Sequence, residues 1–382
     1  MQNLYDYLSG IGFGSMTGGH AVMLGVACVL IFLAIAKKYE PLLLLPLAFG
    51  MFIANIPVSG LSVYDEGGLL FYLYQGVSKG IYPPMIFLCI GAMTDFGPLI
   101  SSPKSALIGL GGQLGIFTAF GGAIGISRLL SGVLGETLFT IKEAAAIGII
   151  GSSDGPTSIY AAEQLAPDLL PMIAIAAYSY MSLVPLIQPP IMRLLTTKRE
   201  RVIVMPQTPR ISKRKKILFP IAVTLVTLFF VPSAGPLVAM LMLGNLLKES
   251  GVAERLVRAL QNDALSLLTM LIGISIGATA TAEHVLRLET VLIIALGLLA
   301  FIFGTAGGIL IAKLLCAVTK GKVNPLIGNA GVSAMPMAAR VSQKLGQQYN
   351  PASHLLMHAM GPIVSSTIGS AVLAGIFIFL LQ

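Results

Sequence analysis

The stretch AAIGIIGSSDGPTSIYAA, residues 145–162, decides the fold because it places a carboxylate and a helix break inside an apolar run. Asp154 is one of only 16 acidic residues in the chain, and a charge near a bilayer centre costs about 3 kcal/mol or more unless it faces a cavity or a partner. Gly155 and Pro156 follow it and break a helix. The sequence therefore predicts two half-helices with an unwound joint at Asp154, which membranes tolerate only where it lines a cavity or is packed in protein.

The composition of the whole chain agrees with a membrane setting. The 382 residues are 55% hydrophobic and 10% charged, and the mean hydropathy is +0.88, which is typical of polytopic membrane proteins rather than soluble domains. The net charge of +8 comes from Lys and Arg clustered between apolar segments, so nucleic-acid binding is not expected. The three cysteines have no paired spacing that indicates a disulfide framework or a zinc site.

Ten apolar runs reach, or nearly reach, the length of a membrane-crossing helix. They lie near residues 20–36, 41–57, 81–96, 105–127, 168–194, 217–231, 234–247, 265–282, 288–313 and 351–378. The basic segment 198–216 holds eight Lys or Arg residues and should stay cytoplasmic. Threading ten crossings from this anchor requires residues 138–164 and 320–346 to be re-entrant hairpins, the first opening outward and the second opening to the cytoplasm.

The second hairpin resembles the first in sequence. At an offset of 180 residues, IGIIGSSDGP at 147–156 aligns with IGNAGVSAMP at 327–336. The identical positions in the two segments are Ile147 and Ile327, Gly148 and Gly328, Gly151 and Gly331, Ser153 and Ser333, and Pro156 and Pro336. Chance similarity between glycine-rich apolar segments is the alternative. With opposite orientations, the units 1–197 and 217–382, joined by the loop 198–216, form two inverted repeats. The expected fold is an all-α polytopic protein of elevator-type transporter architecture, with an ion or substrate site where the broken elements meet.

Oxygen-bearing side chains at the two joints are the candidate cation ligands. Asp154 is the leading one, helped by Ser152 and Ser153, because sodium and other hard cations prefer oxygen donors. A capping role for Asp154 at the start of the following half-helix is the alternative, and the two roles can coexist. The second hairpin offers the neutral oxygens of Asn324 and Ser333 but no carboxylate.

Other polar residues carry alternatives that the sequence leaves open. Arg340 has a planar fork suited to a carboxylated or ureido ligand, whereas ordinary cytoplasmic anchoring is the favoured reading for Lys344. Tyr178 and Tyr180 could donate or coordinate through their hydroxyls, or simply pack. Asp95 is expected to cap a helix or to line a cavity. His354 and His358 are expected to be packed or hydrogen bonded, because no third ligand accompanies them as a catalytic metal site would need.

Five motifs together resemble the beta subunit of the sodium-pumping biotin-dependent decarboxylases, a family that includes the oxaloacetate, methylmalonyl-CoA, glutaconyl-CoA and malonate enzymes. They are GAMTDFGPLI at 91–100, AAIGIIGSSDGPTSIY at 145–160, AAYSYMSLVPLIQPPIM at 176–192, NPLIGNAGVSAMPMAARVSQKLG at 324–346 and LLMHAMGP at 355–362. The resemblance implies a subunit of the bacterial cytoplasmic membrane that decarboxylates carboxybiotin and exports sodium. The chain itself lacks the AMKM signature of a biotinylated domain, so the carboxybiotin arrives on another subunit.

The resemblance also implies partners and residue roles. The partners are a soluble carboxyltransferase subunit, a biotin carrier protein or domain and a small membrane-anchor gamma or delta subunit, in an oligomeric complex. By motif position Asp154 matches the family's sodium-binding aspartate, and Tyr180 and Ser333 match residues of a second sodium site or proton route. Asn324, Gly328 and Arg340 match further required residues, with the arginine associated with carboxybiotin; Gly155, Pro156, Gly328 and Pro336 are expected to shape the hairpins.

One departure from the family pattern affects the ion site. Ile363 follows HAMGP where an asparagine is expected, and its aliphatic side chain supplies no oxygen ligand. An ion-coupled secondary transporter or cation/proton exchanger without decarboxylase chemistry is the alternative function, since inverted repeats with broken helices suit it equally well. Transport without a biotin-bearing partner would favour that alternative.

Overall fold

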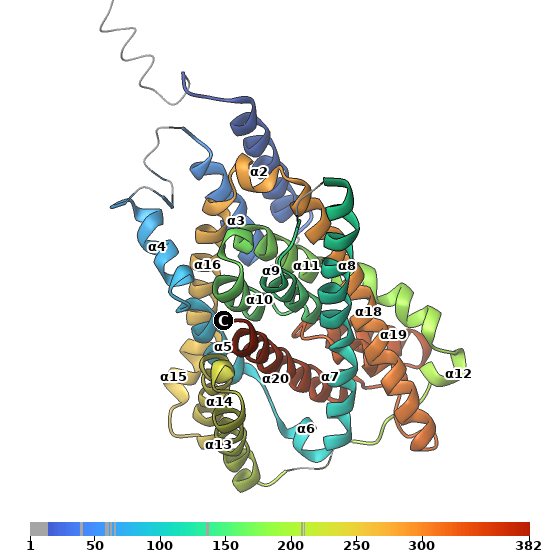
Figure 1. Cartoon of the computed structure of the whole chain (residues 1–382). Helices are drawn as coiled ribbons and strands as arrows, with labels where there is room; N and C mark the ends of the chain where they lie inside the picture. Colours follow the sequence, from blue (N-terminus) through green and yellow to red (C-terminus); the bar gives the residue numbers. More distant parts are fainter. Residues whose placement is uncertain are drawn as a thin grey trace, which may run out of the picture.

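The computed structural model describes residues 14–38, 41–57, 61, 63–64, 66–134, 137–207, 209 and 211–382, and this part of the chain is helical without a strand. The all-α fold class is thereby confirmed. Figure 1 shows the helices gathered into two bundles that lie side by side. The first bundle holds α2 (Gly18–Ala36), α3 (Pro41–Ala54), α4 (Leu69–Ser78), α5 (Tyr82–Met93), α13 (Lys213–Phe230), α14 (Gly235–Ser250), α15 (Glu254–Ala259) and α16 (Leu265–Thr279).

The second bundle contains the two hairpins and the long helices that hold them. Its helices are α7 (Ala106–Gly112), α8 (Leu114–Leu134), α9 (Ile141–Ile149), α10 (Gly155–Leu165), α11 (Leu170–Leu195), α18 (Leu288–Val318), α19 (Met337–Tyr349) and α20 (Leu356–Leu381). Short helices connect the main elements: α6 (Gly97–Ser101), α12 (Lys198–Arg201) and α17 (Ala282–Val285). The chain passes between the bundles more than once, so each bundle combines residues from both halves of the sequence.

Close helix crossings in the first bundle depend on glycine. Helix α3 packs along α16, and α5 packs along α14. A Cβ atom added to Gly91 would lie 1.9 Å from the Leu241 carbonyl oxygen, and one added to Gly244 would lie 2.0 Å from the Leu88 carbonyl oxygen. Small residues that let backbones approach in this way are typical of membrane helix packing.

The hairpins are held where two long helical segments cross in the second bundle. The first hairpin consists of α9, the 3-10 helix η2 (Ile150–Ser152) and α10, and the second consists of the 3-10 helix η6 (Pro325–Gly331) and α19. A Cβ added to Gly112 would lie 1.7 Å from the Gly331 carbonyl oxygen, and one added to Gly115 would lie 2.5 Å from that of Gly151. The crossing of α7 and α8 with α18 therefore brings the backbones of both hairpins into direct contact with glycine surfaces.

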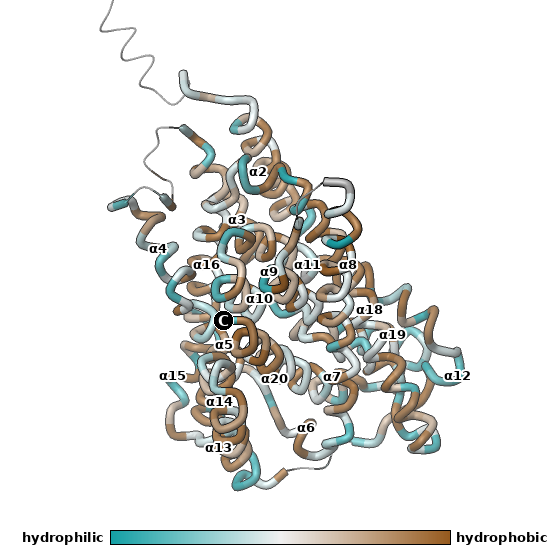
Figure 2. The backbone as a smooth tube through the Cα atoms, viewed as in Figure 1, coloured by the Kyte–Doolittle hydropathy of each residue, from teal (hydrophilic) through white to brown (hydrophobic). Residues whose placement is uncertain are grey.

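Within the part of the chain that the structure describes, five helices are long and apolar enough to cross a membrane: Gly18–Ala36, Pro103–Gly132, Glu254–Thr279, Leu288–Val318 and Leu356–Leu381. Two further pairs, Leu69–Ser78 with Tyr82–Met93 and Pro167–Tyr180 with Leu183–Leu195, are bent by 68° and 60° and raise the number to seven if each is one span. The expected ten crossings therefore stay a prediction. Figure 2 shows hydrophobic residues along most of the helices, with hydrophilic residues near α12 and at the start of α13.

Candidate functional site

The predicted helix break is present at the expected carboxylate. Helix α9 begins with a capping box between Thr140 and Glu143 and ends at Ile149. After η2 the chain turns through Ser153, whose φ of 57° lies in the left-handed region. Asp154 has extended backbone geometry and is the N-cap of α10, so the joint faces the exposed amide groups of a new helix.

The Asp154 carboxylate is buried, with 5% of the residue exposed, and is oriented by hydroxyl groups from two helices. Thr157 Oγ1 donates to Oδ2 at 2.8 Å and the Thr157 amide donates to Oδ1 at 3.5 Å. Ser370 Oγ on α20 donates to Oδ2 at 3.2 Å. The capping interpretation is thus confirmed, and it leaves lone pairs on both oxygens for another ligand.

The tips of the two hairpins touch each other. The Ser333 amide donates to the Ser152 carbonyl oxygen at 2.8 Å, and Ser333 Oγ lies 3.0 Å from Ser366 Oγ on α20. Gln113 Nε2, at the junction of α7 and α8, donates to Ser366 Oγ at 3.1 Å. A hydrogen-bonded chain therefore runs from the helix crossing through α20 to the second hairpin.

Both hairpin tips line a cavity of ≈ 190 Å³, and we call it the hairpin cavity. Five of its lining residues come from the tips: Asp154, Gly155, Pro156, Ser333 and Pro336. The rest of the wall comes from α5, α16, α20 and the second joint, through Ile90, Met93, Leu265, Met335, Met360 and Thr367. One carboxylate in an otherwise apolar wall with a few hydroxyls suits one small cation better than a highly charged one.

Neutral oxygens accompany the carboxylate at the first joint. Ser153 Oγ is buried and has no hydrogen-bond partner in the part of the chain that the structure describes, which leaves its lone pairs available. Ser152 Oγ instead donates back to the Ile149 carbonyl oxygen at 2.8 Å. No group of three His, Cys, Asp or Glu side chains that could hold a metal occurs among the described residues.

Two other predicted ligands lie outside the hairpin cavity wall. Asn324 is the N-cap of η6: its Oδ1 accepts from the Leu326 amide at 2.9 Å, and its Nδ2 donates to the carbonyl oxygen of Ile203 at 2.8 Å. The Tyr180 hydroxyl donates to the Ile294 carbonyl oxygen on α18. Tyr178, rather than Tyr180, lies against the first joint, because a Cβ added to Gly155 would come within 2.4 Å of its ring.

The predicted substrate residue is on the second hairpin but away from the buried tips. Arg340 is in the first turn of α19 and is exposed, as is Lys344 one turn later. Gly328 has a packing function, since an added Cβ would lie 2.4 Å from Ile309 Cα on α18. Ile363, at the position where an asparagine was expected, is fully buried on α20. Its side chain is therefore part of the hydrophobic core.

The remaining sequence candidates have local roles. Asp95 Oδ1 accepts from the Gly97 amide at 2.8 Å and pairs with Lys216 Nζ at 3.0 Å. Burial raises the pKa of Asp95, but the Gly97 hydrogen bond and the Lys216 charge outweigh it and hold the pKa below its ordinary value. This favours the capping interpretation of Asp95. His358 is half-buried on α20, and His354 is exposed.

Sequence reasoning missed the α20 hydroxyls. Ser366, Thr367 and Ser370 occupy one helical face that meets both hairpins. The run SSTIGS at 365–370, polar within an apolar segment, was the available signal. Gln113 carried a similar signal as an amide inside the apolar run 105–127.

Comparison with known proteins shows the family to which the chain is similar. Residues 19–381 match the family model for the Na⁺-transporting oxaloacetate decarboxylase beta subunit. The chain is 50% identical to the methylmalonyl-CoA decarboxylase subunit beta of Propionigenium modestum, covering 100% of this chain and 99% of the relative. It is 52% identical to the glutaconyl-CoA decarboxylase subunit beta of Acidaminococcus fermentans, over 95% and 94% of the two chains.

A third relative is named for a different substrate. The oxaloacetate decarboxylase beta chain 2 of Salmonella typhi is 44% identical, over 99% of each chain. The resemblance inferred from the motifs is thereby confirmed over nearly the whole length. The chain belongs to the family of Na⁺-transporting decarboxylase beta subunits, membrane-embedded components of multi-subunit enzymes that couple decarboxylation to sodium transport.

Proposed function

We propose that this chain decarboxylates carboxybiotin delivered by another subunit and uses the reaction to export sodium across the bacterial cytoplasmic membrane. The observation that carries the proposal is the hairpin cavity, in which Asp154 of the first hairpin and Ser333 of the second line the same buried space. Family membership supplies the reaction class. The cavity is the place where a cation would contact both hairpins.

Asp154 is the proposed sodium ligand. Its carboxylate is already oriented by Thr157 and Ser370, so little reorganisation is needed when the ion enters. Ser153, with its unpartnered hydroxyl, and Ser333 are the neutral oxygens assigned to the same ion or to a second one. A single negative charge against one sodium ion allows release as well as binding, which a pump requires. Tyr180 remains assigned to a second sodium site or proton route on the resemblance alone, and Asn324 remains a candidate ligand through its neutral side-chain oxygen.

The chemical step breaks the bond between the carboxyl carbon and the ureido nitrogen. The electron pair stays on the nitrogen, carbon dioxide leaves and the nitrogen takes one proton. Ser333 is the proposed local proton donor because its hydroxyl is hydrogen bonded to Ser366 and borders the cavity. A cation bound at Asp154 makes a nearby hydroxyl more acidic, and this links ion occupancy to proton delivery. Tyr180 is the second candidate donor.

Arg340 is the proposed guide for carboxybiotin. It is exposed at the start of α19 and forms no ion pair with a carboxylate of the described chain. A guanidinium can bind a carboxylate through two parallel hydrogen bonds. Arg340 and Ser333 belong to the same hairpin. Carboxybiotin bound at the arginine can therefore shift the tip that lines the hairpin cavity.

The proposed architecture is a pair of inverted repeats, 1–197 and 217–382, with elevator-type motion of one bundle against the other. Reciprocal packing supports it: α3 of the first half packs along α16 of the second, and α14 of the second packs along α5 of the first. In the same way α11 packs along α18, and α20 along α7. In each of these two pairs of contacts, a helix of one repeat packs on a helix of the other, and the equivalent helices make the same contact with the repeats exchanged. A two-fold relation between the repeats produces this pattern.

The proposed partners are a carboxyltransferase subunit, a biotin carrier and a small membrane-anchor subunit. In this proposal the soluble carboxyltransferase selects the acid. The substrates for which the relatives are named differ from one another, so they do not transfer to this chain.

Reconstitution tests the function directly. We expect the complete complex in liposomes to take up sodium only while it releases carbon dioxide from a carboxylated donor, and avidin to stop both processes. Sodium transport by this chain without a biotin-bearing partner, unaffected by avidin, would replace the proposal with secondary transport.

A further inference from the structure

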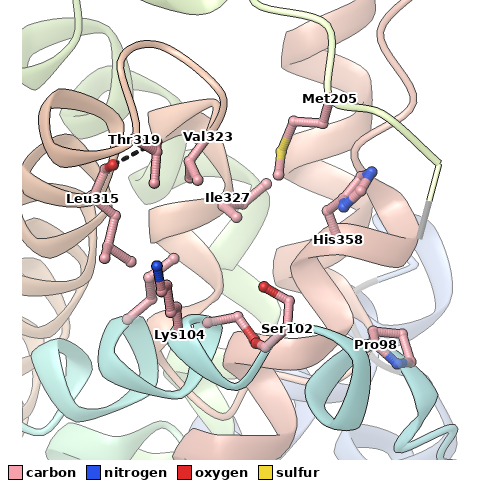
Figure 3. A pocket seen from close by; sticks show the side chains of 11 residues that line it. Pro98, Ser102, Lys104, Met205, Leu315, Thr319, Val323, Ile327 and His358 are labelled. Atoms are coloured by element: carbon pink, nitrogen blue, oxygen red, sulfur yellow. Dashed lines mark hydrogen bonds between the residues drawn. The ribbon is translucent and has the colours of Figure 1, made fainter. Parts of the chain in front are cut away.

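A second cavity lies beside the basic segment, away from the hairpin cavity. It has a volume of ≈ 100 Å³. The wall combines the start of α7, the end of α18, the start of η6 and the start of α20, and its lining residues include Lys104, Thr319, Ile327 and His358. Figure 3 shows Lys104 extending toward Leu315 and Thr319, with Met205 and His358 across the cavity.

A segment of the basic loop forms part of this wall, and we call residues 196–207 the strap. Buried Arg201 fastens it: Nε donates to Thr196 Oγ1 at 2.8 Å and Nη1 donates to the Tyr349 hydroxyl at 2.7 Å, while the guanidinium lies 4.9 Å from the centre of the Tyr349 ring. Asn350 Nδ2 donates to the Val202 carbonyl oxygen at 3.1 Å. The strap thereby carries Met205 into the cavity wall. We name this space the strap cavity.

The strap is tied to both ends of the second hairpin. Asn324, at the beginning of the hairpin, donates to the carbonyl oxygens of Arg201 at 3.2 Å and Ile203 at 2.8 Å. Tyr349 and Asn350 make their bonds from its far end. The strap and the second hairpin are therefore linked by hydrogen bonds. A ligand held beneath the strap is connected through them to the hairpin tip that lines the hairpin cavity.

The polar groups of the strap cavity select a particular ligand chemistry. Lys104 is exposed and, within the described residues, has no ion pair, so its charge is uncompensated. His358 lines the same cavity, and a neutral imidazole has one N–H donor and one acceptor nitrogen. A cation and an acceptor across a small, largely apolar space suit a carboxylate attached to a group with its own N–H.

We propose that the strap cavity is the subsite where the carboxylated ureido group of the carrier's biotin is first held, before it reaches the hairpin cavity. Lys104 binds the carboxylate, and His358 accepts from the ureido N–H that carboxylation leaves intact. The apolar residues exclude water from the group. This inference rests on the proposed function, because it takes carboxybiotin as the substrate.

The test uses the assembled complex and radiolabelled carboxylated carrier, with initial carbon dioxide release measured against carrier concentration at saturating sodium. Lys104→Met should raise the half-saturating carrier concentration roughly tenfold, since a charge-assisted hydrogen bond is lost, with little change in the maximal rate. Lys104→Arg should retain most of the affinity. Lys322→Met removes an exposed lysine that does not line the cavity and should behave as wild type.

A Lys104→Met complex with wild-type half-saturation would overturn the inference while leaving the proposed function standing. Failure of the wild-type complex to release carbon dioxide would instead overturn the proposed function. Val323→Phe, which fills the cavity without altering Lys104, is the second variant and should also raise the half-saturating concentration. Free bicarbonate that competes as strongly as the carboxylated carrier would refute the assignment to the ureido group, because the cavity would then take any small oxyanion.

Discussion

Replacing Asp154 by asparagine separates its capping role from its proposed ion-binding role. Asparagine and aspartate are comparable N-cap residues, and the amide oxygen can still accept from the Thr157 backbone. The new amide N–H groups face the hydroxyls of Thr157 and Ser370, which can accept as well as donate. We therefore expect the unfolding free energy to change by less than about 1 kcal/mol.

The loss of negative charge has a larger effect on the ion. Hydrogen bonds and contacts that involve a charged group contribute about 1.5 to 3 kcal/mol. This corresponds to a rise in the half-saturating sodium concentration of roughly ten- to a hundredfold. Asp154→Asn should therefore lose most sodium-dependent activity at sodium concentrations that saturate the wild type, yet remain folded and assembled.

Two measurements on one preparation check this expectation. Carbon dioxide release is followed as sodium is varied, and radioactive sodium uptake into liposomes is followed in parallel. Ser370→Ala is the matched control, because it removes the 3.2 Å hydrogen bond to Oδ2 and keeps the charge; it should shift sodium dependence by less than about tenfold. Wild-type sodium dependence in Asp154→Asn would refute the assignment of the ion to this carboxylate.

Four further changes test other parts of the structure. Gly112→Ala should destabilise the protein by about 1–3 kcal/mol, because its Cβ would meet a carbonyl oxygen of the second hairpin at 1.7 Å, whereas Gly121→Ala meets nothing within 4 Å and serves as its control in thermal unfolding. Ser153→Gly should raise the unfolding temperature, because its φ of 57° suits glycine and the unpartnered hydroxyl disappears, while half-saturating sodium rises; unchanged sodium dependence would remove this serine from the ion site. Ser333→Ala should lower the sodium-saturated decarboxylation rate at least about tenfold, and an unchanged rate would exclude it as proton donor. Arg201→Met should expose the strap to protease, measured by mapping new cleavage sites, and an unaltered digestion pattern would show that other contacts suffice to hold it.

Local chemistry made the first joint predictable from sequence. Proline and glycine end a helix wherever they occur in this arrangement, and a carboxylate at the next helix start is oriented by amide groups that exist in any fold. For the same reason the break at Asp154 and the short α10 lie where expected. The second joint at Ser333 was found through its similarity to the first. Apolar composition required membrane-compatible packing regardless of topology.

Contacts between distant segments could not be read from the sequence. Ser370 reaches Asp154 across 216 residues, and only the path of α20 past both hairpins brings them together. Tyr178 and Tyr180 lie two residues apart on α11, and the sequence could not tell which of them faces the joint. The structure places the ring of Tyr178 against Gly155, while the Tyr180 hydroxyl bonds to α18. The number of membrane crossings also depends on helix bends and packing rather than hydropathy alone.

The sequence by itself determined the class of the protein, the broken hairpins and the carboxylate at the first break, because these follow from the solvation of charge in lipid and from the backbone chemistry of neighbouring residues. Only the tertiary structure decided which oxygens share a cavity with Asp154, that Asn324 fastens the strap, and that Lys104 lines a second cavity. Those outcomes depend on how helices far apart in the chain cross, and helix crossings are set by side-chain packing over the whole molecule.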